Sequence, residues 1–139
     1  MRMDHISLAV RSMAASMPYY STLLSLLGFR EAHPGVWEDS EGFTFQFFEA
    51  DANTPGYARY GAGLNHLGFR APSEEAVKDV RDRMAEAGFP VPAIQDLDGA
   101  KALFMKDPDG IRFEVTYYSP RAKVVDGSES VQARSTAAR

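Results

Sequence analysis

The sequence contains no cysteine among its 139 residues. This absence excludes disulfide bridges, thiolate metal ligands and a cysteine nucleophile, and it is compatible with a reducing compartment. The sequence also lacks the ~18 consecutive apolar residues that a membrane-spanning helix needs. The N-terminus leads into an alternating pattern rather than into the apolar block of a signal peptide. We therefore expect a cytoplasmic protein with no membrane partner, in which any metal is bound by nitrogen and oxygen atoms.

Positive charge is also scarce in this chain. The 15 lysines and arginines are outnumbered by 19 aspartates and glutamates, which gives a net charge of −4. The basic residues form no cluster that could follow a phosphate backbone, so nucleic acid is not an expected partner. The length and the hydrophobic content of 45% fit one globular domain, or two half-size modules that share a core.

The two halves of the chain repeat one pattern. Each half contains a polar residue and a histidine that open an alternating strand, then a Gly-Phe pair, then a turn that leads into another alternating strand. The first half carries these landmarks at Asp4-His5, Gly28-Phe29 and residues 39–47, and the second half at Asn65-His66, Gly88-Phe89 and residues 107–115. An internal repeat of this kind predicts two copies of one structural unit.

A helix is predicted after the first strand of each copy. The buried faces, with helical spacing, are formed by Tyr20, Leu23, Leu24 and Leu27 in the first copy and by Val77, Val80, Met84 and Ala87 in the second. Ser73 is a good N-cap for the second helix. The first helix could begin at Ser12 or at Ser16, and Pro18 is expected to be tolerated only in its first turn.

Short strand-like runs follow each helix and are separated by turn residues. They cover residues 29–32, 36–38 and 43–48 in the first copy, and residues 91–94, 101–105 and 111–118 in the second. The order βαβββ therefore occurs twice, which predicts an α+β fold whose two tandem modules form a cupped mixed β-sheet with the helices on the outer face.

The expected domain spans residues 1–119. It consists of a first module at about 1–50, a connector at 51–63 and a second module at about 64–119. Residues 120–139 lack apolar periodicity and are expected to form an accessory tail.

Strand alternation decides which side chains share a face of the sheet, because successive residues point to opposite sides. The apolar side of each strand should lie under the helices. By this parity His5, Gln46, His66 and Glu114 all fall on the opposite side. Two imidazoles, a carboxylate and an amide oxygen suit a divalent ion such as Zn, Fe, Mn, Co or Ni. We therefore predict one metal site formed by these four residues.

Each of these residues also has a structural interpretation. A single strand histidine is often structural, but His5 and His66 occupy equivalent repeat positions. Glu114, in an otherwise apolar strand, would be costly to bury without a cation. Gln46 is the weaker candidate, because backbone groups can satisfy an inward amide, and its direct contact with the metal stays open. Since Gln46 is neutral, the bound ion keeps more positive charge, which should weaken metal binding and make a coordinated oxygen more acidic.

Further side chains on the same predicted face could contact a substrate. Aromatic residues there suggest an apolar or aromatic substrate, although such residues more often belong to a core or an interface; they are Phe48, Tyr118 and, from loops, Trp37, Tyr57 and Tyr60. Arg70 and Arg112 could hold an anionic group by a bidentate contact. Equally, both arginines could be solvated at the rim.

These landmarks resemble the vicinal oxygen chelate superfamily, which comprises glyoxalases, bleomycin-resistance proteins and dioxygenases. The resemblance covers residues 1–119 and is carried by Asp4-His5-Ile6, Tyr19-Tyr20, Leu27-Gly28-Phe29, Asn65-His66-Leu67-Gly68-Phe69, Lys106-Asp107-Pro108-Asp109-Gly110 and Phe113-Glu114. It implies two modules that make a cup around a metal ion, with His5, Gln46, His66 and Glu114 as ligands and with Glu114 and Gln46 also acting in catalysis. The implied chemistry is Lewis-acid stabilisation of an enolate or oxyanion.

The resemblance leaves the reaction open. A lactoylglutathione lyase usually has a carboxylate where this chain has Gln46, whereas the His, Gln, His, Glu pattern resembles methylmalonyl-CoA epimerase. A dioxygenase-type Fe(II) site would need only His5, His66 and Glu114. The alternative class is a non-catalytic antibiotic-binding protein, although such proteins generally lack metal ligands. We expect a metal-dependent homodimeric enzyme for a small oxygenated or aromatic molecule, with modules that pair within one chain or between chains.

Overall fold

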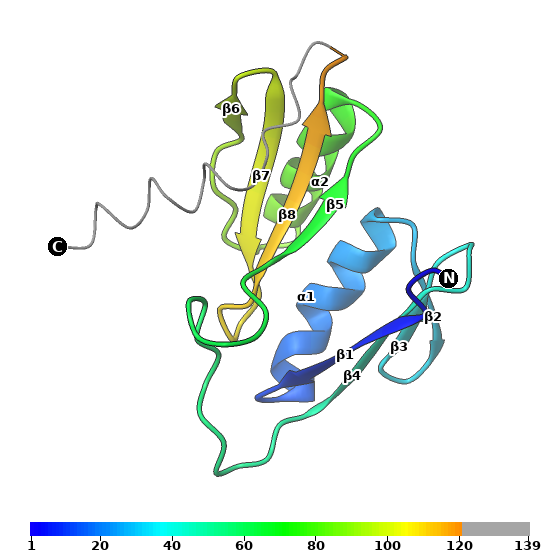
Figure 1. The fold of residues 1–139 in the computed structure, drawn as a ribbon, viewed down its shortest axis with the longest axis vertical. Coiled ribbons are helices and arrows are strands. Elements are labelled where there is room, and N and C mark those ends of the chain that lie inside the picture. Colours follow the sequence, from blue (N-terminus) through cyan, green and yellow to red (C-terminus); the bar gives the residue numbers. More distant parts are fainter. Residues whose placement is uncertain (121–139) are drawn as a thin grey trace, which may run out of the picture.

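A computed structural model describes residues 1–120 and contains two modules, each with one helix and four strands (Figure 1). The first module consists of β1 (His5–Val10), α1 (Met13–Leu26), β2 (Arg30–His33), β3 (Val36–Glu38) and β4 (Thr44–Glu49). The second consists of β5 (Leu67–Arg70), α2 (Glu74–Glu86), β6 (Gln95–Leu97), β7 (Ala100–Lys106) and β8 (Arg112–Tyr118). The predicted accessory tail lies, beyond residue 120, outside the described residues. Neither helix of this part of the chain is long and apolar enough to span a membrane.

Each module builds its own four-stranded sheet. The strand orders are β1-β4-β3-β2 and β5-β8-β7-β6, so the second sheet repeats the first strand for strand. The outer strand pairs β1 with β4 and β5 with β8 are parallel, and the remaining pairs are antiparallel. This matching order confirms the predicted α+β fold with two tandem βαβββ units.

The turn before the last strand of each module is also duplicated at the atomic level. The aspartate that opens the turn accepts two backbone N–H groups with its Oδ1 atom, Asp39 in the first module and Asp107 in the second. Three residues later Gly42 and Gly110 adopt φ values of 82° and 85°. Because this left-handed region favours glycine, the Asp-x-x-Gly pattern determines the same turn twice.

Two local expectations are wrong. Ser12 caps α1, and Pro18 therefore lies inside the helix, beyond its first turn. The helix continues because the turns that follow Pro18 bury a large apolar face, which offsets the lost hydrogen bond. The short strand of the second module is β6 at Gln95–Leu97 rather than residues 91–94. Pro90 precedes the predicted run and Pro92 lies inside it, and proline cannot donate a ladder hydrogen bond.

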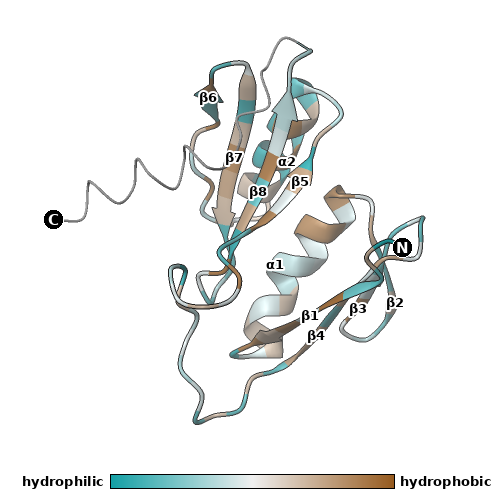
Figure 2. Cartoon of the chain, in the orientation of Figure 1, coloured by the Kyte–Doolittle hydropathy of each residue, from teal (hydrophilic) through white to brown (hydrophobic). Residues whose placement is uncertain are grey.

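One hydrophobic core joins the two modules. Tyr20 of α1 lies 5.5 Å, between ring centroids, from Phe113 of β8, and Phe45 of β4 lies 6.0 Å from Phe69 of β5. Phe45, Phe69 and Phe113 lie on the helix-facing sides of their strands, and Tyr20 lies on the buried face of α1. Polar and apolar residues alternate along the first part of β8 (Figure 2). The helix α1 lies between the two sheets (Figure 1). The modules of one chain therefore meet through their helix-covered sides.

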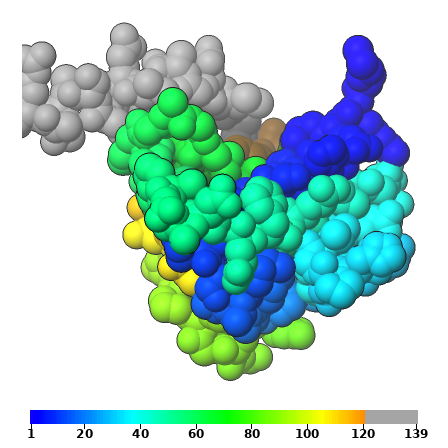
Figure 3. All heavy atoms as spheres, turned by 90° about the horizontal axis from the view of Figure 1, so that it is seen from below, coloured from blue at the N-terminus to red at the C-terminus, as the bar shows by residue number. Residues whose placement is uncertain are grey.

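Polar contacts reinforce this junction. The Tyr20 hydroxyl donates to Oδ2 of the buried Asp107 at 2.6 Å, and the Arg11 backbone N–H donates to Asp109 Oδ2 at 2.7 Å. Both contacts join the first module to the turn before β8. The connector, coloured teal-green in Figure 3, lies on the surface between the modules and adds no strand to either sheet. The relative position of the modules is thus set by packing and by these two contacts.

Candidate metal centre

The second module brings two of the predicted ligands together. His66 directly precedes β5, and Glu114 lies in β8 opposite Gly68 of β5. The His66 Nε2 atom is 3.1 Å from Glu114 Oε2. The other carboxylate oxygen, Oε1, accepts a hydrogen bond from the Thr116 hydroxyl at 2.5 Å. Both oxygens of Glu114 are therefore oriented, one by Thr116 and one towards the imidazole.

The residues around His66 determine which of its ring nitrogens carries a proton. The Asn65 amide nitrogen donates to the Arg59 carbonyl at 2.8 Å, which turns the amide oxygen of Asn65 towards His66. This oxygen lies 2.8 Å from His66 Nδ1, and since it can only accept, Nδ1 must carry a proton. The Tyr57 hydroxyl also donates to the Asn65 backbone carbonyl. The connector thus helps to present Nε2 of His66 as the atom available to a metal.

The contact between His66 and Glu114 fits a metal ion. With Nδ1 protonated, a neutral imidazole offers a lone pair at Nε2, and the carboxylate also offers lone pairs. Two such acceptors at 3.1 Å need either a second imidazole proton or a cation between them. Ligand atoms that share one zinc ion lie roughly 2.9–3.5 Å apart, because bonds of about 2.0–2.2 Å meet at about 90–110°. The observed separation lies within that range.

The first module carries the equivalent pair in a more open arrangement. Nδ1 of His5 contacts Oδ2 of Asp4 at 2.7 Å, as Nδ1 of His66 contacts Asn65. Gln46 lies opposite Ser7 in the strand register, and its amide oxygen accepts the Ser7 hydroxyl at 3.3 Å. The amide nitrogen of Gln46 faces the Thr44 hydroxyl at 3.5 Å. The Gln46 amide is therefore oriented, and Nε2 of His5 is the ring nitrogen left for a metal.

The two pairs do not meet within one chain. Residues 1–120 contain no group of three or more His, Cys, Asp or Glu side chains placed to hold a metal ion. His66 and Glu114 are therefore together, but His5 is not beside them. The reason is the junction described above: the helix-covered sides of the modules face each other, so the sides that carry the ligands point away from the shared core. The four-residue site stays a prediction about the assembled protein.

The candidate substrate residues fall into two groups. Phe48 and Tyr118 expose 52% and 41% of their surface at the ends of β4 and β8, and Arg70 lies over the Tyr118 ring. Arg112 is half-buried at the start of β8. Trp37 is only 6% exposed and belongs to the core, which is the alternative that sequence analysis left open for these aromatic residues. As an apolar residue of β3, it packs on the helix side of its sheet.

Two further candidates from loops lie in the connector. Tyr57 supports Asn65 through its hydroxyl, whereas Tyr60 is exposed and contacts the guanidinium of Arg59 at 5.0 Å from its ring centroid. Neither observation assigns a substrate contact. Tyr57 instead belongs to the set that orients the histidine.

Sequence analysis missed the supporting residues of this centre, which are Asp4, Asn65 and Thr116. The signal for the first two was present, because a polar residue with a side-chain oxygen precedes the histidine in both copies of the repeat. Thr116 could have been found from parity, since residues 114 and 116 share one face of β8.

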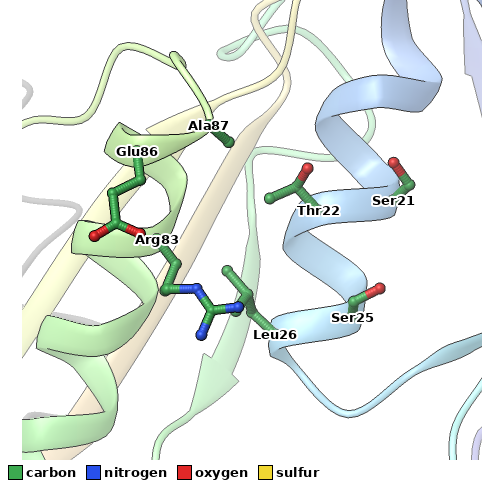
Figure 4. Close-up of a pocket in the computed structure, with 7 residues that line it drawn as sticks. All are labelled: Ser21, Thr22, Ser25, Leu26, Arg83, Glu86 and Ala87. Atoms are coloured by element: carbon green, nitrogen blue, oxygen red, sulfur yellow. The ribbon is translucent and has the colours of Figure 1, made fainter.

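A separate hollow lies between the helices. A groove of about 440 Å³ runs between α1 and α2, and its walls include Ser21, Thr22 and Arg83 (Figure 4). Both hydroxyls donate to the Pro18 carbonyl, so they satisfy the helix backbone. Figure 4 shows the Arg83 side chain extending towards Leu26. The groove lies on the helix side of the molecule and contains none of the predicted ligands.

The fold and this arrangement of residues place the chain in a known family. The glyoxalase/bleomycin resistance protein/dioxygenase superfamily model matches residues 2–115, and the chain belongs to that superfamily. The uncharacterized protein YqjT of Bacillus subtilis (strain 168) is 31% identical over an alignment of 124 residues that covers 81% of this chain and 96% of that protein.

Solved structures share the fold. A glyoxylase/bleomycin resistance protein/dioxygenase domain from Frankia sp. EAN1pec superposes with a TM-score of 0.74 at 24% identity, over 88% of this chain and 95% of that one. The genomically encoded fosfomycin resistance protein FosX from Listeria monocytogenes superposes with a TM-score of 0.64 at 17% identity, over 86% of this chain and 95% of that one. At identities this low, the superpositions establish a common fold and no more. The reaction has to be argued from the site.

Proposed function

We propose that this chain is a cytoplasmic, divalent-metal-dependent enzyme that acts on a small oxygenated or aromatic molecule and whose site is shared by two copies of the chain. The observation that carries the proposal is the contact of His66 Nε2 with Glu114 Oε2 at 3.1 Å, in a module whose Asn65 holds the other ring nitrogen, Nδ1, and so presents Nε2 to a metal. The second module of one copy supplies these two ligands. The first module of the other copy supplies His5 and Gln46.

Pairing of two copies follows from the packing within one copy. The helix-covered sides of both sheets are already packed against each other, so the opposite sides, which carry the predicted ligands, are left for a partner. Those sides carry the exposed aromatic residues Phe48 and Tyr118. Exposed apolar side chains with polar groups beside them are typical of interaction surfaces. A homodimer with two-fold symmetry would then contain two equal sites.

The reaction class follows from the residues around the metal. The metal ion, when bound, would supply a Lewis acid that stabilises negative charge on a substrate oxygen. Glu114 is the one carboxylate of the four ligands, so it is the group that could hold a proton taken from the substrate. The Thr116 hydroxyl at Oε1 orients that carboxylate. Gln46 is neutral and can orient a substrate but cannot accept its proton. An isomerase, lyase or dioxygenase reaction fits this set.

Metal content is the first test. Protein purified without chelators should hold transition metal or take it up on titration, and replacement of Glu114 by Gln should lower the content more than replacement of Gln46 by Ala. Glu114 contributes both a charge and a ligand in contact with His66, which explains this order. Less than about a tenth of an equivalent of metal per chain, with none taken up, would instead favour a non-catalytic binding protein.

Mixed dimers test whether the site is shared. His5→Ala copies lack a ligand of the first module, and Glu114→Gln copies lack one of the second, so neither variant alone should bind metal normally. After unfolding and refolding together, a dimer with one copy of each retains one intact site if the site is shared. An equal mixture should then recover about a quarter of the wild-type metal content. No recovery in verified mixed dimers would mean that each site is built within one chain.

A further inference from the structure

A second feature lies on the same face of the second module as Glu114. Arg70 ends β5, and its guanidinium carbon is 5.6 Å from the centroid of the Tyr118 ring at the end of β8. Ala71, Pro72 and Tyr117 complete, with these side chains, the wall of a hollow of about 260 Å³. A cavity of roughly 150 Å³ can accommodate benzene, so this hollow can take a carboxylate together with part of an aromatic ring.

The guanidinium of Arg70 is ready to bind an anion. A guanidinium that stacks on an aromatic ring keeps the N–H groups at its edge available for a bidentate contact. In the part of the chain that the structure describes, Arg70 forms no ion pair, whereas Arg30 is paired with Glu38 and Arg81 with Asp82. Arg70 therefore carries a positive charge that the described residues do not neutralise.

The strand register relates the backbone position of Arg70 to that of Glu114. Gly68 lies opposite Glu114, and Arg70 lies opposite Thr116. Two residues along a strand correspond to about 7 Å, and side chains two apart lie on the same face. Arg70 is thus one side-chain step along the strand from the residue opposite Glu114, and the hollow extends from there to Tyr118 at the end of β8. A small molecule that lies along this face can contact both Arg70 and Glu114.

On the basis of the proposed function, we infer that the substrate is a small carboxylic acid whose carboxylate binds to Arg70 and whose reacting oxygens lie next to Glu114, further along the same face of the sheet. Tyr118 holds the guanidinium in place and provides an apolar wall for the carbon skeleton. Arg70 and Tyr118 are then the residues that determine which molecules enter the site.

The surroundings favour a carboxylate over a phosphate group. Arg70 is one planar donor that can hold two oxygens of either anion, but its single positive charge balances a carboxylate fully and a doubly charged phosphate only in part. The helix α2 begins directly after the hollow, and its first turn carries Glu74 and Glu75. These two carboxylates would oppose a doubly charged phosphate more than a singly charged carboxylate. The hollow should therefore discriminate between the two anions.

Binding of benzoate, benzamide and inorganic phosphate to the full-length protein tests this inference. Titrations are followed by the NMR signal of the Arg70 side chain, with the protein as purified and again after metal removal. Benzoate should shift this signal in both forms, and benzamide, which has the same shape without the charge, should bind at least about tenfold more weakly. Phosphate should also bind more weakly than benzoate.

Matched variants locate the site. Arg70→Gln should weaken benzoate binding, measured by calorimetry, at least about tenfold. Arg83→Gln, which alters an arginine in the other hollow, should leave it unchanged. Tyr118→Phe keeps the ring and should bind benzoate within about twofold of wild type, whereas Tyr118→Ala should weaken it several-fold. Circular dichroism checks that each variant is folded.

Three results would overturn the inference: equal affinity for benzoate and benzamide, unchanged binding in folded Arg70→Gln protein, or tighter binding of phosphate than of benzoate. Because the metal-free protein is also titrated, a failure here is distinct from a failure of the metal site. Protein that holds metal but ignores benzoate refutes only the carboxylate subsite. Protein that binds benzoate at Arg70 but never holds metal refutes only the proposed enzyme.

Discussion

Replacing Tyr20 by Phe removes the hydroxyl that joins the two modules. Tyr20 is fully buried, and its ring contacts Phe47 and Phe113 at centroid distances of 4.3 and 5.5 Å. Phenylalanine keeps these ring contacts, so the substitution deletes little besides the hydrogen bond to Asp107 Oδ2. The carboxylate of Asp107, only 5% exposed, would lose one of its donors and keep the backbone N–H groups at Oδ1.

The loss in the free energy of unfolding caused by Tyr20→Phe should depend on pH. Burial raises the pKa of Asp107, and the Tyr20 hydrogen bond opposes that rise. Without the hydroxyl this pKa rises further. The unfolded chain releases the proton near pH 4, so the stability of the folded state falls as pH increases from there to the native pKa. The fall should be larger in the variant. We expect a loss of about 1.5–3 kcal/mol at pH 7, typical of a bond to a charged group, and about 0.5–1.5 kcal/mol at pH 4.

Urea unfolding at several pH values, at a fixed protein concentration, measures this difference. The buried Trp37 is the only tryptophan and provides the fluorescence signal. Tyr19→Phe is a matched control, because the buried Tyr19 hydroxyl has no hydrogen-bond partner among residues 1–120, and its removal should cost almost nothing at any pH. Asp107→Asn should abolish the extra loss at pH 7. An equal cost of Tyr20→Phe at pH 4 and pH 7 would refute the assignment of a charged acceptor.

Other substitutions test the centre and the helix cap. Asn65→Ala should weaken metal binding about 10–100-fold, measured by competition with a chelator, because it frees the His66 ring to rotate or change tautomer. Thr116→Val, nearly equal in volume, should weaken it less, since only one oxygen of Glu114 loses its partner; the reverse order would contradict the described roles. Ser73→Ala should lower the free energy of unfolding by about 1 kcal/mol without changing metal content, because it removes only the N-cap of α2.

Local patterns in the sequence were sufficient for most of the fold. The repeated Asp-x-x-Gly turn, the two serine caps and strand alternation all act over a few residues, and they predicted the repeated βαβββ order. Where a local rule gave the wrong result, the burial of apolar side chains against residues far away in the chain decided the structure. Pro18 lies within α1 because the buried face of that helix outweighs one lost hydrogen bond. Trp37 is in the core because the apolar side of β3 packs under a helix.

The candidate site also has one part that strand alternation predicted and another part that depends on how the two sheets pack. Parity placed His66 and Glu114 on one face of one sheet, and the structure brings them to 3.1 Å because neighbouring strands set that distance. Parity says nothing of how two sheets face each other. That depends on aromatic packing between residues far apart in the chain, such as Tyr20 with Phe113. The amino-acid sequence by itself therefore determined two modules and placed one pair of predicted ligands on the same face of each. Only the tertiary structure decided that both pairs point away from the shared core. The helix-covered sides of the two modules pack against each other, so the opposite sides, which carry these residues, do not face each other within one chain.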